Sequence, residues 1–237
     1  IWGNGVVAHT VVSNCYAPPG GGSCAGGGVY QMGGTLRDSQ VLDCYVRQNF
    51  QGSAIWQSGG LCERCVFGDS AHENGYGAAV YLTGGTNRNN VIRRAWTSLS
   101  AVQALRMSGG RFWNNTVVTN GWASTQESPV AASVTGGEVK NCIFACNKGA
   151  DVDDAGERVS FSRFAEATDA RGNTAADPRF RNLDKPVWTL SGSSPCANRG
   201  DMSIWAEEPA PVDFFRKPRI KNRRVDMGAC ECQAGGM

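Results

Sequence analysis

The side chains best suited to chemistry form one small group of acids and arginines in the first half of the chain. Asp43 and Asp69 stand 26 residues apart, Arg94 follows 25 residues later, and His72 and Glu73 come just after Asp69. Two carboxylates beside a guanidinium could bind calcium, or act as general acid and base on a polysaccharide. Whether they do so depends on the elements that bring these positions together.

A repeat marked by pairs of glycines indicates which strands form and how they are arranged. The steps between pairs are 25 to 27 residues, and a short strand-like segment stands on either side of each pair. The pairs are Gly33-Gly34, Gly59-Gly60, Gly84-Gly85, Gly109-Gly110 and Gly136-Gly137. A unit of this length, with two-residue alternation, cannot bury its own apolar face, but copies stacked on one another can.

This pattern predicts an all-β fold, a parallel β-helix with about 25 residues per coil and long parallel sheets. We expect the coils in residues 1–165 and an irregular C-terminal capping segment, residues 166–237, packed on the same domain. Equivalent positions should form columns along the axis. The predicted inward column is Val41, Phe67, Ile92, Val117 and Phe144, and the predicted bend column is His9, Ser39, Cys65, Asn90, Asn115 and Cys142.

Two outward columns could bind ligands, but both have a simpler structural interpretation. The first, Tyr30, Trp56, Tyr81 and Arg106, suggests a sugar-binding platform. Stacking between coils would present ring edges instead, and this interpretation is favoured. The second alternates in sign, which indicates charge pairing on a solvated face. Its members are Arg37, Glu63, Arg88, Trp113 and Lys140.

The acid and arginine group also has a structural interpretation, which we favour. Arg94 would neutralise Asp43 and Asp69 at the ends of neighbouring strands. Zinc is not expected, since most of the cysteines in the "CERC" and "CIFAC" segments should face the core and no histidine-rich segment accompanies them. The sequence requires no cofactor, and calcium is the ion that these acids, or "DVDD" at 151–154, could hold.

Charge and cysteine content limit the compartment and the partners. Ten cysteines in 237 residues favour secretion, and a net charge of +2 gives no basis for nucleic-acid binding. No apolar stretch is long enough to insert into a membrane. Cys15 and Cys24 bracket a proline- and glycine-rich insertion, so we expect a disulfide between them. Cys65 and Cys142 should remain unlinked.

The C-terminal third resembles the closing segment of secreted bacterial right-handed β-helix proteins of the choice-of-anchor Q type, within the pectate-lyase-like superfamily. Three motifs carry the resemblance: Ala176, Asp177, Pro178 and Phe180; Leu190, Gly192, Ser194 and Pro195; Pro218, Arg219, Val225, Asp226, Gly228, Ala229 and Glu231. The resemblance implies a right-handed β-helix that is exported and displayed at a bacterial surface, and it transfers no catalytic residue. Cys196 and Cys230 depart from the family pattern and are a candidate disulfide.

Together these features predict a noncatalytic extracellular or cell-surface β-helix with a structural, adhesive or glycan-binding role. Its partners would be glycans or other surface proteins, without nucleic acid. Two alternatives stay open. One is a polysaccharide lyase or glycoside hydrolase built on the same coils. The other is a filament subunit stacked end to end, suggested by the start "IWGNG", which resembles the middle of a coil.

Overall fold

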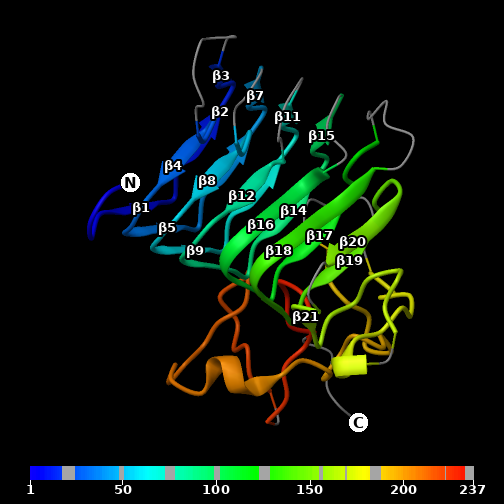
Figure 1. Ribbon diagram of the computed structural model, residues 1–237. Coiled ribbons are helices and arrows are strands. Elements are labelled where there is room, and N and C mark those ends of the chain that lie inside the picture. Colours follow the sequence, from blue (N-terminus) through cyan, green and yellow to red (C-terminus); the bar gives the residue numbers. More distant parts are fainter. Residues whose placement is uncertain are drawn as a thin grey trace.

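The computed structural model is an all-β solenoid with about 26 residues per turn, as the glycine repeat predicts. It describes residues 1–17, 25–47, 51–72, 78–98, 102–122, 129–154, 157–168, 170–181, 188–221 and 223–232. Three parallel sheets run along the axis, and successive coils lie side by side from the N-terminal end onward (Figure 1). None of the helices in these ranges is long and apolar enough to cross a membrane.

The strands before and after the glycine pairs form the largest sheet. Its members are β1 (Val6–Ala8), β4 (Val29–Gln31), β5 (Thr35–Arg37), β8 (Ile55–Gln57), β9 (Leu61–Glu63), β12 (Val80–Leu82), β13 (Thr86–Arg88), β16 (Val102–Trp113), β18 (Val130–Lys140), β20 (Ala150–Asp154) and β21 (Val159–Ser160). In β16 and β18 the chain continues through the glycine pair as one strand, so this sheet is continuous across both halves of the repeat.

Two smaller sheets complete each coil. The second sheet contains β2 (Val11–Ser13), β6 (Gln40–Leu42), β10 (Val66–Gly68), β14 (Val91–Arg93), β17 (Thr116–Val118) and β19 (Ile143–Ala145). The third contains β3 (Tyr16–Ala17), β7 (Tyr45–Val46), β11 (Ala71–His72) and β15 (Trp96–Thr97). Two short 3-10 turns, η1 (Ala170–Gly172) and η2 (Met202–Trp205), lie in the C-terminal part.

The two glycines of each pair are needed for different reasons. A Cβ on the first glycine would enter the backbone of the preceding coil, as at Gly84, where it would lie 2.3 Å from the carbonyl oxygen of Ser58. The second glycine has a positive φ, 78° at Gly85, which a side chain rarely adopts. The pair therefore provides close approach followed by a left-handed turn.

The predicted inward column is confirmed. Val41, Phe67, Ile92, Val117 and Phe144 are partners on neighbouring strands of the second sheet, and all five are fully buried. The assignment of His9 to the bend column is wrong by one residue. Val6 pairs with Thr35 and Ala8 with Arg37, so His9 is equivalent to Asp38, and Thr10 takes the position of Ser39.

Residues in the left-handed backbone conformation form two corners in each coil. The first corner column joins the largest sheet to the second, with φ between 49° and 56°: His9, Asp38, Arg64, Asn89, Asn114 and Asn141. The second corner column, which joins the second sheet to the third, is Asn14, Asp43, Asp69, Arg94, Thr119 and Cys146. Asparagine and aspartate tolerate this conformation better than most side chains.

Just after the first corner, asparagine side chains that point inward accept hydrogen bonds from backbone N–H groups of the preceding coil. Oδ1 of Asn90 accepts from the N–H of Cys65 at 2.6 Å, and Oδ1 of Asn115 accepts from the N–H of Asn90 at 2.7 Å. These bonds satisfy groups that the bend removes from the sheet ladder. The expected structural role of the bend column is therefore confirmed for its asparagines.

The C-terminal segment packs along the side of the solenoid. We call residues 196–232 the C-terminal strap, since it runs back along the first corner column toward the N-terminal coils (Figure 1). Asp201 contacts Asn141 and Trp205 contacts Asn114. Arg219 contacts Asn89, and Arg216 reaches Asp38.

Apolar packing fixes the C-terminal part over the second sheet. Trp188, Leu190, Cys196 and Met227 form one cluster with the outer residues Val118, Ile143 and Ala145. Ala229 and Cys230 form another with Val91. The segment predicted as a cap thus covers an outer sheet face.

Candidate functional site

The acid and arginine group predicted from the sequence is an ion-paired corner. Nε of Arg94 lies 2.7 Å from Oδ1 of Asp69, and Nη2 of Arg93 lies 3.6 Å from Oδ2. Asp43 occupies the equivalent corner one coil earlier and is exposed. Both carboxylates stand at left-handed positions, where aspartate is a favoured residue for the backbone alone.

His72 does not join this group. It lies in β11, pairs in register with Val46 and Thr97, and is fully buried. The sequence placed it in a loop on the same side as Asp69, which the structure contradicts, because the strand continues through this position and turns the ring inward. Glu73 lies outside the described residues. Of the five candidates, only Asp69 and Arg94 are brought into contact by the described geometry.

The outward aromatic column stacks as the structural interpretation expects. The rings of Tyr30 and Trp56 lie 4.6 Å apart between centroids, with their planes 7° apart. Tyr81 and Arg106 continue the column on β12 and β16. Because the rings of Tyr30 and Trp56 face one another, each covers one face of the other.

A groove on the same sheet offers a better site. It has a volume of about 670 Å³, its floor is the outer face of β9, β13, β16 and β18, and its wall is the C-terminal strap at residues 203–209. The charged and aromatic residues that line it are Arg88, Arg111, Trp113, Glu138, Glu207 and Glu208. Volumes in this range accommodate a small-molecule ligand or a short oligosaccharide.

Trp113 and Arg111 lie next to each other on the groove floor. The guanidinium carbon of Arg111 lies 5.2 Å from the centre of the Trp113 ring, and the indole N–H donates to Oε2 of Glu138 at 3.0 Å. Arg111 is exposed and forms no ion pair with any residue in the described ranges. Its donors are therefore available to a ligand, while Trp113 holds its plane in place.

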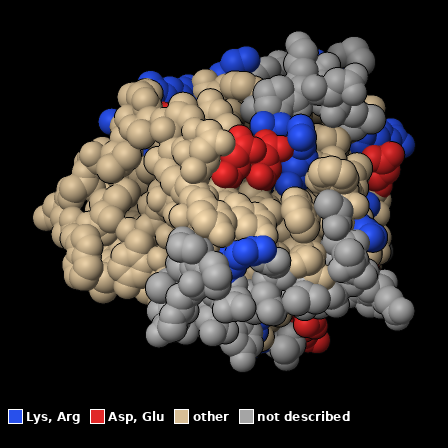
Figure 2. All heavy atoms as spheres, turned by 90° about the horizontal axis from the view of Figure 1, so that it is seen from above, with Lys and Arg blue, Asp and Glu red and all other residues tan. Residues whose placement is uncertain are grey.

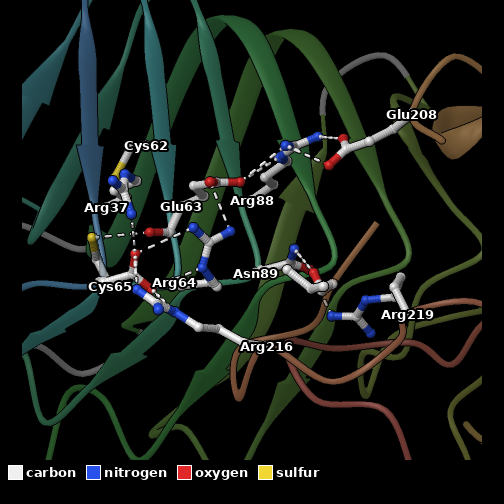
Figure 3. Close-up of polar contacts among 12 residues, drawn as sticks. Arg37, Cys62, Glu63, Arg64, Cys65, Arg88, Asn89, Glu208, Arg216 and Arg219 are labelled. Carbon is white, nitrogen blue, oxygen red and sulfur yellow. Dashed lines mark hydrogen bonds and ion pairs between the residues drawn. The ribbon is translucent and has the colours of Figure 1, made fainter. Parts of the chain in front are cut away.

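A chain of ion pairs joins the groove to the first corner column (Figure 3). Glu208 lies 2.5 Å from Arg88, and Arg88 lies 2.9 Å from Glu63. Glu63 lies 2.7 Å from Arg64, which in turn bonds Asp38 at 2.8 Å. The chain fixes the strap wall to the sheet floor, so the groove keeps its shape.

Asp38 is a carboxylate held by three arginines. Burial alone would raise its pKa, but hydrogen bonds from Arg64, Arg216 and Arg37 outweigh that effect and lower the pKa well below its usual range. Arg216 also approaches Nε2 of His9 at 3.2 Å. Asp38 therefore stays charged and acts as an anchor for the strap.

A second polar cluster is buried beneath the strap. Arg219 is fully buried and donates to Asn89 and to the carbonyl of Ala229, at 2.6 and 2.5 Å. Glu231 lies 3.4 Å from Arg219 and accepts from the N–H of Asp226 at 3.1 Å. Desolvation raises the pKa of Glu231 to about 8, and it raises that of Asp226 as well. This cluster contains several residues of the third C-terminal motif and is structural.

The surface charges are mixed in sign. Figure 2, seen from the top of Figure 1, shows acidic and basic atoms side by side, and few charges over the N-terminal part at the left. Within the described ranges no group of three or more metal-ligating side chains is found. In the "DVDD" segment, Asp151 is buried and bonds Arg163 at 3.0 Å.

The predicted disulfide between Cys196 and Cys230 is not formed. Both thiols are free, and they lie in the two separate apolar clusters under the strap. Spacing along the chain could not reveal this, because it does not show which strand each cysteine covers. Cys65 and Cys142 are free and buried, as predicted. Cys15, predicted to pair with Cys24, is also a free thiol, and Cys24 lies outside the described residues.

Comparison with known proteins adds no assignment: no family model, no curated protein and no solved structure matches this chain. The resemblance to the choice-of-anchor Q proteins therefore stays a prediction, while the parallel β-helix itself is observed.

The sequence missed the groove because one wall comes from a distant segment. Trp113 was recognised as an outward residue, but Glu208 is 120 positions from its partner Arg88. The available signal was the sign alternation of Arg37, Glu63 and Arg88 on neighbouring coils, which indicated a charged face without showing what covers it.

Proposed function

We propose that this chain is an extracellular or cell-surface β-helix, related to the choice-of-anchor Q type, that binds a glycan segment without turnover. The groove beside Trp113 carries the proposal. It combines an aromatic ring, an exposed guanidinium and carboxylates on a rigid sheet, and these are the groups that recognise sugar hydroxyls and rings.

A binding role agrees with how the groove charges are arranged. Glu138 is held by Lys140 at 2.9 Å and by the indole of Trp113, and Glu208 is held by Arg88. These contacts fix the positions of both carboxylates on the groove lining. The groove therefore presents positioned hydrogen-bonding groups that can accept from sugar hydroxyls.

The test is a binding panel of neutral and charged oligosaccharides, read by calorimetry on the full chain. Arg111→Ala should weaken binding by about 10-fold or more, the effect of losing a charge-assisted hydrogen bond. Arg199→Ala, an exposed arginine that does not line the groove, is the matched control. Unchanged affinity in Arg111→Ala, or equal losses in both variants, would contradict the groove as the site.

The enzyme alternative keeps one supporting observation. Glu138, Glu207 and Glu208 line the same open groove as Arg111, so acids and a cation converge on one ligand. A polysaccharide lyase would release unsaturated products, and a glycoside hydrolase would release new reducing ends. Either product, lost in Glu138→Gln with the melting temperature unchanged, would replace the binding proposal with catalysis.

A further inference from the structure

Two cysteines occupy equivalent positions on the first two coils. Tyr16 pairs with Tyr45 and Ala17 with Val46, which places Cys15 opposite Cys44 in the same register. The N–H of Tyr45 donates to the carbonyl of Cys15 at 2.8 Å, so the backbones are in direct contact here. Neighbouring strands are about 4.8 Å apart, within the range of Cα separations that disulfides span.

The two side chains also meet. Cys44 is fully buried in the main core, and Cys15 is partly buried against the same cluster. Each thiol donates to the backbone carbonyl two residues before it, Cys15 to Ser13 at 3.8 Å and Cys44 to Leu42 at 3.4 Å, so the two side chains have the same orientation in the column. Burial, with the neighbouring Cys15, raises the pKa of Cys44 to about 12. Cys44 is therefore the less reactive thiol of the two, and Cys15 is the one that reacts first.

This column holds cysteine only at its beginning among the described coils. Ala71 pairs with Tyr45, and Trp96 pairs with Ala71, so the next positions of the column are Ser70 and Ala95. Asn120 and Asn147 follow on the later coils, so the column accepts small side chains and amides. Packing in this column therefore does not require cysteine on the first two described coils.

We infer that Cys15 and Cys44 form a redox pair whose disulfide links the first coil to the second. The oxidant is a small-molecule or protein disulfide. The thiolate of Cys15, the more accessible sulfur, attacks it, forms a mixed disulfide and releases one thiolate. Cys44 then loses its proton and attacks the Cys15 sulfur, which forms the internal bond and releases the second thiolate. Two protein thiols are oxidised, one disulfide is reduced to two thiols, and the two protons go to the released thiolates.

The bond would secure the part of the solenoid with the fewest neighbours. Strands β1, β2 and β3 each pair with one strand only among the described residues. Their outward side chains Val6, Val11 and Tyr16, together with Trp2, are largely exposed. A covalent link to the second coil would limit local opening of this edge. The inference does not depend on the glycan groove.

Peptide mapping tests the pairing. The full chain is incubated with oxidised glutathione, free thiols are alkylated, and a nonreducing digest is read by mass spectrometry. We expect a Cys15–Cys44 peptide in the wild type and in Cys24→Ser, and none in Cys44→Ala. The alanine mimics Ala95 in the same column, so this variant should fold. A Cys15–Cys24 peptide instead, or Cys15 and Cys44 both alkylated, would overturn the inference.

Hydrogen exchange gives a second, independent readout. Amides of residues 6–17 should exchange on the order of 100-fold more slowly in the oxidised protein than in the reduced protein. The control is Cys65→Ser, which removes a fully buried thiol elsewhere in the core and should keep the difference. Equal exchange in the two redox states of the wild type would show that no bond secures this edge.

Discussion

The indole N–H of Trp205 donates a hydrogen bond to Oδ1 of Asn114 at 3.0 Å, across 91 positions of sequence. The same asparagine donates through Nδ2 to the carbonyls of Asp226 and Gly228. Asn114 is fully buried at a left-handed corner, so one residue sets the bend of its coil and docks the strap.

Asn114→Ala should therefore destabilise the fold by about 3 kcal/mol, because it leaves buried partners of the strap unsatisfied. The free energy of unfolding in urea measures the loss. Thr119→Ala changes the equivalent residue of the second corner column, which has a similar φ of 57° and bonds only its neighbour Val118. It should cost under about 1 kcal/mol. Similar losses of unfolding free energy in both variants would mean that the backbone conformation of the corner, and not the contacts with the strap, accounts for the effect.

The assignment of side chains to the inner or outer face predicts that two aromatic-to-alanine substitutions lower the stability by unequal amounts. Phe67→Ala should cost about 3–5 kcal/mol, since Phe67 is fully buried in the core. Tyr81→Ala, on the outer face, should cost much less. Denaturant titrations of both variants at one temperature give the comparison, and equal losses of stability would contradict the inward and outward assignment.

The first glycine of each pair should tolerate no side chain. Gly84→Ala would place a Cβ 2.3 Å from the Ser58 carbonyl and should destabilise by about 2–4 kcal/mol through backbone displacement. Gly5→Ala is the matched change, because its nearest contact would be an ordinary 3.5 Å to Trp2. Thermal melts should separate the two. A stable Gly84→Ala protein would show that neighbouring coils are less tightly fixed.

Stability should fall as pH rises from about 5 to 8. Glu231 has a pKa of about 8 in the folded protein, because burial disfavours its charge, whereas an unperturbed glutamate has a pKa of 4.5. Between these values the folded state binds the extra proton, so its contribution is present at low pH and is lost as pH approaches 8. Asp226 acts in the same direction, whereas Asp38 contributes stability that is lost only in acid.

Glu231→Gln should flatten that slope, since the amide imitates the protonated acid. The measurement is the free energy of unfolding at several pH values from 5 to 8, with Glu157→Gln as the exposed control. An unchanged slope in Glu231→Gln would remove Glu231 as its source.

Asp69→Asn tests the site first suggested by sequence. The Asp69 and Arg94 pair is partly solvated, and asparagine is compatible with the φ of 53° at this corner. We expect a loss under about 1 kcal/mol and unchanged glycan binding. Calorimetry with the ligand that responds to Arg111→Ala provides the check, and a large loss of affinity would return the functional site to this corner.

The repeat predicted most of the fold, because stacked coils convert sequence spacing directly into contacts. Val41 and Phe67 could be placed in one column since the same period separates them and their neighbours. His9 was misplaced because the first coil has no preceding glycine pair to fix its register. The path of the strap was not predictable, since contacts such as Arg219 with Asn89 join segments that share no repeat.

The path of the strap also changes how the whole molecule should come apart. In a solenoid whose repeats touch only their neighbours, the end coils unzip one at a time. Here contacts to His9, Asp38, Asn89, Asn114 and Asn141 tie one continuous segment to coils along nearly the full length of the rod. Unfolding one coil must therefore disturb the contacts that the strap makes with the other coils. The chain should melt in a single cooperative transition, like a globular domain.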